Sequence, residues 1–167
     1  MPTRDPLATS GLPNLKRNDV PKGDDVPKDG KPFGTQFLIL VVDDAVDNLA
    51  MISLALQQQG YQVVTAANGE DAVSVAKQTL PNLILMDINL PGLDGLGATR
   101  RIRETEGLRN VPVVAVTALG TEGFQRAAYD AGVSGYLTKP IDLDRMNQLI
   151  ARLLSPGSSG NLHRPTG

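Results

Sequence analysis

Short apolar runs that stop abruptly at a polar residue recur along this chain, and a helix-spaced segment follows each of them. The strongest runs are 37–42, 83–86 and 111–116, which are apolar at nearly every position. A strand that is apolar on both sides is typical of a parallel sheet covered on both faces, whereas a sheet with one wet face alternates apolar and polar residues. The pattern therefore predicts an α/β fold with helices on both sides of a sheet.

Five strand–helix units fit between residues 35 and 154. The expected strands are 37–42, 61–65, 83–86, 111–116 and 134–137, and the expected helices are 46–59, 70–78, 97–106, 121–131 and 141–154. Alternation of this kind implies parallel strands joined by right-handed crossovers. On the helix 97–106 we expect the side chains of Arg100, Arg101 and Arg103 to face solvent.

The segments on either side have a different composition. Residues 1–34 hold six of the twelve prolines and almost no apolar periodicity, and residues 155–167 are rich in Gly, Ser and Pro. Such segments bury too little apolar surface to offset the entropy of ordering them. We expect a disordered N-terminal tail (1–34), one folded domain (35–154) and a disordered C-terminal tail (155–167).

Composition excludes several classes of function. The chain has no cysteine, so disulfides and thiolate metal sites are excluded. Residues 1–34 hold six lysines and arginines and five aspartates, a net charge of +1, so a nucleic-acid-binding arm is not expected. The longest apolar run, 37–42, is far too short to span a bilayer, and without a secretory segment we expect a cytoplasmic protein. Neither GxGxxG after the first strand nor GxxxxGK[ST] occurs, so a nucleotide cofactor is not expected.

Polar residues with related chemistry stand where the strands end. Asp43 and Asp44 follow the first run, Asp87 the third, Thr117 the fourth and Lys139 the fifth. The carboxyl ends of parallel strands lie along one edge of the sheet, which is where open α/β sheets bind ligands. We therefore expect these side chains to form one site. Taken singly, each also has a structural explanation, the aspartates as helix caps and Lys139 as a surface charge.

Three carboxylates in one place would repel one another unless a cation lies among them. Hard oxygen ligands suit Mg²⁺, which takes one or two protein carboxylates together with waters and phosphate oxygens. A phosphoryl group on Asp87 would then be neutralised by the metal and by the Lys139 ammonium, and the Thr117 hydroxyl could donate to a further oxygen. The pattern thus predicts an electrostatically stabilised aspartyl phosphate.

With these motifs the chain resembles the receiver (REC) domain of two-component response regulators. The matching segments are Val41-Val42-Asp43-Asp44, Met86-Asp87-Ile88-Asn89-Leu90-Pro91-Gly92-Leu93-Asp94-Gly95, Val116-Thr117-Ala118 and Thr138-Lys139-Pro140. The resemblance covers about 37–154 and includes every functional position of the family. It implies a flavodoxin-like, CheY-like (βα)5 fold with strand order 2-1-3-4-5.

The resemblance also implies a role for each site residue. Asp87 is the phosphoacceptor. Asp44 and Asp87 bind Mg²⁺ directly, the backbone carbonyl of Asn89 is the third protein ligand, and Asp43 acts mainly through water.

Three further positions carry the signal in this family. Thr117 is implied as the switch hydroxyl, Lys139 as the cation that pairs with phosphate, and Tyr136 as the aromatic side chain whose rotamer reports activation. The Lys139–Pro140 bond is expected to be cis, a form almost confined to X-Pro.

A receiver is a signalling protein rather than an enzyme. The resemblance implies that it takes a phosphoryl group from a histidine kinase or a histidine phosphotransfer protein, and signals by protein contact or onward phosphotransfer. Because only thirteen residues follow Leu154 and the chain opens on Met1, we expect a stand-alone receiver.

Two alternatives belong to other classes. A haloacid-dehalogenase-like phosphatase also forms an aspartyl phosphate, but that family has Asp-x-Asp after its first strand, where this chain has Asp43-Asp44-Ala45-Val46. A pseudo-receiver would be a binding module that is never phosphorylated, and the intact set of acids argues against it.

Two hypotheses concern residues outside the motifs. Met51 and Leu54 point away from the apolar stripe of the first helix, so we expect them to be exposed and to dock a partner helix. Leu119, two residues after Thr117, is expected to hinder water and so to lengthen the life of the phosphoryl group.

Overall fold

The computed structural model describes residues 37–118 and 120–155. The tails predicted at 1–34 and 155–167, apart from Ser155, lie outside the described residues, and so does Leu119. The elements in chain order are β1 (Leu38–Val42), α1 (Val46–Gln58), β2 (Gln62–Ala66), α2 (Gly69–Thr79), β3 (Leu83–Asp87), α3 (Gly95–Glu104), β4 (Val113–Thr117), α4 (Glu122–Asp130), β5 (Gly135–Thr138) and α5 (Leu143–Leu154).

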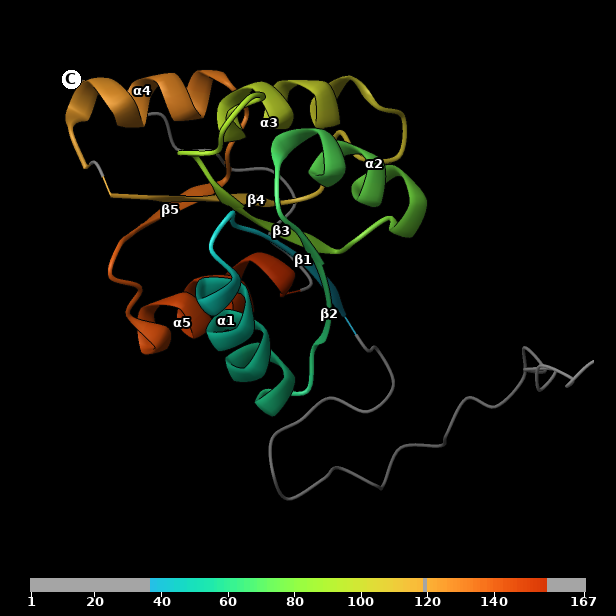
Figure 1. Ribbon diagram of the computed structural model, residues 1–167, viewed down its shortest axis with the longest axis vertical. Coiled ribbons are helices and arrows are strands. Elements are labelled where there is room, and N and C mark those ends of the chain that lie inside the picture. The colour runs from blue at the N-terminus through green and yellow to red at the C-terminus, as the bar shows by residue number, and fades with distance from the viewer. Residues whose placement is uncertain (1–36, 119, 156–167) are drawn as a thin grey trace, which may run out of the picture. The chain divides into compact units, whose positions relative to one another are not determined.

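The five strands form one parallel sheet in the order β2-β1-β3-β4-β5. Helices α1 and α5 cover one face, and α2, α3 and α4 cover the other (Figure 1). This confirms the predicted fold class and strand order. None of the helices in the described part of the chain is long and apolar enough to cross a membrane.

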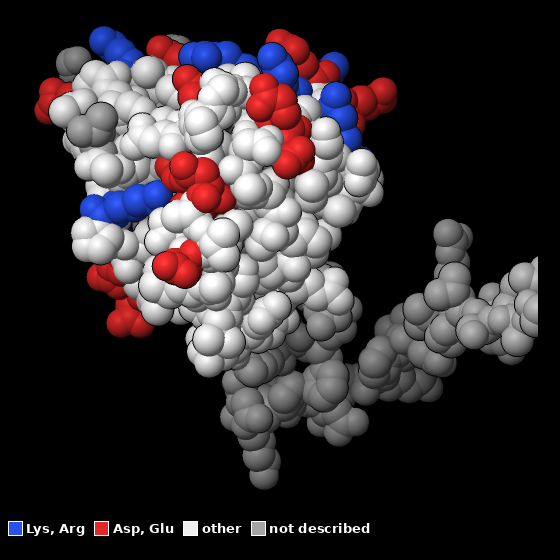
Figure 2. Space-filling view, in the orientation of Figure 1, with Lys and Arg blue, Asp and Glu red and all other residues white. Residues whose placement is uncertain are grey.

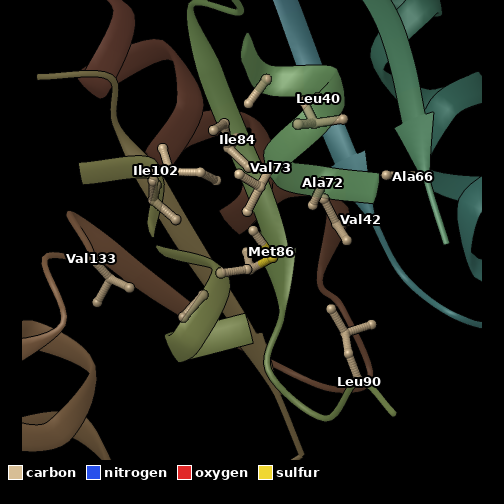
Figure 3. Packing of buried hydrophobic residues seen from close by; sticks show 14 of the residues in the cluster. Leu40, Val42, Ala66, Ala72, Val73, Ile84, Met86, Leu90, Ile102 and Val133 are labelled. Atoms are coloured by element: carbon tan, nitrogen blue, oxygen red, sulfur yellow. The ribbon is translucent and has the colours of Figure 1, made fainter. Parts of the chain in front are cut away.

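Each face of the sheet has its own hydrophobic cluster, because successive residues of a strand point to opposite sides. In β3, Ile84 and Met86 join the cluster under α2, α3 and α4, part of which is shown in Figure 3. Leu83 and Leu85 join the cluster under α1 and α5. This arrangement explains why the run 83–86 is apolar at every position.

Two helix starts differ by two residues from those predicted, and a capping aspartate explains each, whereas α2 and α4 start within one residue of the prediction. Helix α3 begins at Gly95 rather than at residue 97, because the Asp94 carboxylate accepts the N–H of Gly97 at 2.7 Å. Helix α5 begins at Leu143 rather than at residue 141, because Asp142 accepts the N–H groups of the next turn. A side-chain oxygen that accepts free N–H groups in the first turn defines where a helix starts.

The pairing register brings the functional strand ends to one edge. Val42 pairs with Met86, Asp87 with Val116, and Thr117 with Thr138. The residues that follow β1, β3, β4 and β5 therefore meet at the carboxyl edge of the sheet.

Candidate functional site

Asp87 is the last residue of β3 and is 2% exposed. Its Oδ1 accepts the backbone N–H of Asn89 at 3.0 Å, and its Oδ2 lies 2.9 Å from the Nζ of Lys139. The start of α3 lies so close that a Cβ at position 95 would overlap the carbonyl oxygen of Asp87, so only glycine fits at Gly95. The loop after β3 is thus folded tightly against the carboxylate.

Asp43 follows β1, is 1% exposed and accepts three hydrogen bonds. The backbone N–H of Ala45 donates to its Oδ1 at 2.8 Å. Its Oδ2 accepts from the side-chain amide of Asn48 and from the Nζ of Lys139, both at 3.1 Å. Asp44 differs, because it is exposed and its carboxylate takes no hydrogen bond within 37–118 and 120–155.

The three aspartates form a single acidic cluster. One carboxylate oxygen from each of Asp43, Asp44 and Asp87 lies within 4.8 Å of the other two. Figure 2 shows acidic side chains gathered near the middle of this face of the molecule. Hard carboxylate oxygens at this spacing fit the ligand preference of Mg²⁺, as the sequence predicted.

Lys139 joins two of these carboxylates. Its Nζ forms ion pairs with Asp87 at 2.9 Å and with Asp43 at 3.1 Å. Burial alone would lower the pKa of Lys139, but the hydrogen bonds and negative charges of Asp87 and Asp43 outweigh it and raise the pKa above its ordinary value. The side chain is therefore a charged ammonium at neutral pH.

The chain around Lys139 is fixed to the neighbouring strand. The backbone N–H of Lys139 donates to the carbonyl of Thr117 at 2.8 Å, and the Lys139–Pro140 bond is cis, as predicted. Thr117 is 1% exposed at the end of β4, beside the strand that carries Asp87. Tyr136 is half-buried on β5 and packs against the cluster under α2, α3 and α4.

The structure thus brings together five of the predicted side chains, those of Asp43, Asp44, Asp87, Thr117 and Lys139, at one edge of the sheet. The side chain of Asn89 is exposed, and Tyr136 lies one residue before the end of β5. Sequence reasoning missed Asn48. The available signal was a polar residue in the first turn of α1, five positions after Asp43.

Comparisons with known proteins agree with this geometry. The family model of the response regulator receiver domain matches residues 39–151. Protein PilH of Pseudomonas aeruginosa is 36% identical over 117 residues, which cover 70% of this chain and 97% of PilH. Response regulator PleD of Caulobacter vibrioides is 39% identical over 104 residues, which are 62% of this chain but only 23% of PleD. The chain therefore spans less than a quarter of the length of PleD.

Solved structures show the same fold. Chemotaxis protein CheY4 of Vibrio cholerae superposes with a TM-score of 0.70 at 27% identity, covering 72% of this chain and all of CheY4. The receiver domain of the sensor histidine kinase PA1611 of Pseudomonas aeruginosa superposes with a TM-score of 0.67 at 37% identity, covering 72% of this chain and 98% of that domain. The PA1611 structure holds a magnesium ion coordinated in its active-site cleft.

Proposed function

The chain belongs to the response regulator receiver domain family, and from this premise we propose that it is phosphorylated on Asp87 with the help of Mg²⁺. The observation that carries the proposal is the charge arrangement around one buried carboxylate. The Lys139 ammonium lies 2.9 Å from Asp87 Oδ2, and Asp43 and Asp44 complete an acidic cluster beside it. A cation on one side and a cation site on the other are what an acyl phosphate needs.

Phosphorylation is a transfer between two phosphoryl carriers. A carboxylate oxygen of Asp87 attacks the phosphorus of a phosphohistidine on a kinase or phosphotransfer protein. The P–O bond forms as the P–N bond breaks, and the imidazole leaves and takes up a proton. Lys139 donates to the phosphoryl oxygens, and the hydroxyl of Thr117, at the end of the adjacent strand, donates to another.

The hydrogen bonds of the acidic cluster support a division of labour among the metal ligands. An ionised carboxylate offers about four acceptor positions. Asp43 uses three of them within the protein, whereas Asp44 uses none in the described ranges. This difference supports the ligand set that the family resemblance implies, in which Asp44, Asp87 and the backbone carbonyl of Asn89 would hold Mg²⁺ directly and Asp43 would act through water. A Mg²⁺ ion held there would supply positive charge to offset the negative charge of the arriving phosphoryl group.

Thr117 and Tyr136 transmit the effect of phosphorylation at Asp87 to the neighbouring strand. Thr117 moves toward the phosphoryl group, and the ring of Tyr136, half-buried on the neighbouring strand, follows into the space that this leaves. Signalling is then stoichiometric, with one phosphoryl group per chain rather than continued turnover of a phosphate ester.

Phosphorylation by acetyl phosphate tests the site without a protein partner. We expect the full chain to gain one phosphoryl group, seen by intact-protein mass spectrometry, only when Mg²⁺ is present. Asp87→Asn should abolish this gain, whereas Asp130→Asn, at the exposed end of α4, should not. A wild-type chain that is never labelled would support the pseudo-receiver. Turnover of many acetyl phosphate molecules per chain would support the phosphatase.

The partner-facing surface is proposed to be α1. Met51 is 45% exposed and Leu54 is 58% exposed, as predicted, and Val46 at the start of the helix is 76% exposed. Figure 2 shows uncharged surface next to the acidic side chains. An exposed apolar face beside a reactive site fits a helix of a histidine kinase or histidine phosphotransfer protein.

Replacing both Met51 and Leu54 with serine separates docking from chemistry. The double variant should accept phosphoryl groups more slowly from the histidine kinases and phosphotransfer proteins of the source organism, yet as fast as wild type from acetyl phosphate. Gln57→Ser/Gln58→Ser, exposed near the end of the same helix, is the matched control. Equal loss with both donors would indicate a folding defect and contradict the docking role.

A further inference from the structure

The carboxylate of Asp43 accepts three hydrogen bonds from the protein, although its proposed contact with Mg²⁺ is through water. Its Oδ2 accepts from Lys139 of the β5–α5 connection and also from Asn48 of α1, each at 3.1 Å. The Asp43 side chain is 2% exposed, so bulk water supplies little of its hydrogen bonding. Losing one of these donors would therefore leave a buried charged oxygen short of a partner.

The two donors on Oδ2 are not equivalent. Lys139 Nζ divides its hydrogen bonds between Asp43 and Asp87, and the Asp87 contact is the shorter, at 2.9 Å. Any group added to Asp87 competes for the same ammonium. The Asn48 amide donates to Asp43 alone among the described residues, so a group added to Asp87 does not compete for it.

The chemistry of the amide also matters. A neutral amide orients the carboxylate without cancelling its charge, whereas a basic residue at position 48 would neutralise one of the three acids that attract a cation. Together with the N–H of Ala45 on Oδ1, Asn48 fixes both oxygens of Asp43. Asn48 thus orients the carboxylate without adding to the charge compensation that Lys139 already provides.

We propose that Asn48 is a positioning residue for the acidic cluster, which holds Asp43 toward Asp44 and Asp87 and thereby sets the affinity of the site for Mg²⁺. This inference rests on the proposed function, because it assumes that the cluster binds Mg²⁺. Groups that orient metal-site carboxylates typically change metal affinity by about 10–100-fold when removed.

The test is a Mg²⁺ titration of the full chain, followed by the backbone amide NMR signals of residues 43–45 and 87–89. We expect Asn48→Leu, which keeps the volume but has no donor, to raise the dissociation constant for Mg²⁺ by about tenfold. Asn48→Gln keeps an amide donor and should recover part of the affinity. Circular dichroism melting without Mg²⁺ reports the stability of each variant separately.

The matched control is Asn68→Ala. Asn68 caps α2 by accepting the N–H of Asp71 at 2.8 Å, so its loss should lower the melting temperature and leave Mg²⁺ affinity within about twofold of wild type. If Asn48→Leu and Asn48→Gln both bind Mg²⁺ as tightly as wild type, Asn48 does not position the site. A wild-type chain whose signals do not respond to Mg²⁺ would overturn the metal part of the proposed function and this inference with it.

Discussion

At the scale of single residues, Lys139 forms ion pairs with two buried carboxylates. Replacing it with methionine retains the length of the side chain but leaves Asp43 and Asp87 without their shared cation. Removing one partner of a well-buried ion pair costs about 3–5 kcal/mol, and since the lysine side chain is 27% exposed we expect about 2 kcal/mol here. Urea denaturation without Mg²⁺ measures this difference in unfolding free energy.

The pH dependence of that difference follows from the raised pKa of Lys139. A folded-state pKa above the unfolded value means that the stabilisation is fully present below the ordinary lysine value of 10.5 and is lost as the pH rises through the folded value. The gap in stability between wild type and Lys139→Met should stay constant around neutral pH and narrow only above 10.5. If the difference in unfolding free energy between wild type and Lys139→Met already disappears near pH 7, the Lys139 ammonium is not what stabilises the folded chain.

Leu80 has an unfavourable backbone conformation that a substitution can relieve. It follows Thr79 as the C-terminal cap of α2, with φ of 48° in the left-handed region, which is a strained conformation for leucine and one that asparagine tolerates. Leu80→Asn should therefore raise the free energy of unfolding by about 0.5–1 kcal/mol, measured by urea denaturation. Leu54→Asn is the matched control, because Leu54 is also 58% exposed but lies inside α1. There asparagine is a poorer helix former and should destabilise.

At the scale of elements, the Arg103 side chain of α3 ties together two connections. Its guanidinium donates to the carbonyls of Leu108 and Val111 before β4, and to the carbonyl of Gly132 after α4, at 2.7–3.1 Å. Burial lowers the pKa of Arg103, yet arginine remains charged at any pH at which the protein folds. One planar cation therefore satisfies the carbonyls of Val111 and Gly132 and is a second donor to the carbonyl of Leu108, which also accepts the N–H of Val111.

Removing that cation should destabilise the chain strongly. We expect Arg103→Met to lower the free energy of unfolding by about 2–3 kcal/mol, because the carbonyls of Val111 and Gly132 lose the donor that satisfies them and each carries a desolvation penalty. Arg103→Lys should recover only part of the loss, since an ammonium cannot reproduce the fork of the guanidinium. Arg101→Met, exposed on the same helix, should change stability by less than about 0.5 kcal/mol. Equal effects at positions 101 and 103 in thermal melts would refute the bridging role.

Arg103 also shows where sequence reasoning stops. Periodicity located every strand and helix, because burial on both faces of a sheet leaves a signal within a few neighbouring residues. It wrongly placed Arg103 in solvent with Arg100 and Arg101, since the carbonyls that bind it lie up to 29 residues away in the chain. The starts of α3 and α5 were misplaced for a different reason, because apolar periodicity does not register the local caps that Asp94 and Asp142 form with N–H groups two or three residues away.

The residues of the site, like the helices and strands, could be predicted from the sequence only in part. Asp87, Thr117 and Lys139 could be placed together because parallel strands deliver their ends to one edge. The hydrogen bond from Asn48 to Asp43 depends on how α1 leaves that edge, and apolar spacing along the helix contains no information on it. The order of strands along the sequence thus predicted the reactive residues, whereas the contact from Asn48 to Asp43 became visible only in the structure.

At the scale of the whole molecule, the described residues form two hydrophobic clusters, one on each face of the sheet. Within the described ranges, the buried residues of both clusters fall between Ile39 and Ile150, and the partly buried ones extend to Leu154. The strand ends that form the site are anchored from both sides, by α2, α3 and α4 on one face and by α1 and α5 on the other (Figure 1). All the described helices and strands that position the acidic cluster and Lys139 lie within the span 35–154.

Deleting the chain on both sides of 35–154 should leave this domain folded. The segments removed lack the apolar periodicity that builds a core, so the melting temperature should change by less than about 2 °C, as expected when truncation removes no buried contact. Differential scanning calorimetry of the full chain and of 35–154 measures the change. The matched control ends at residue 148 and thereby removes Ile150 from the core under α1 and α5, which should lower the melting temperature by many degrees. A span 35–154 that melts as low as this control would mean that the deleted segments contribute to the packed core.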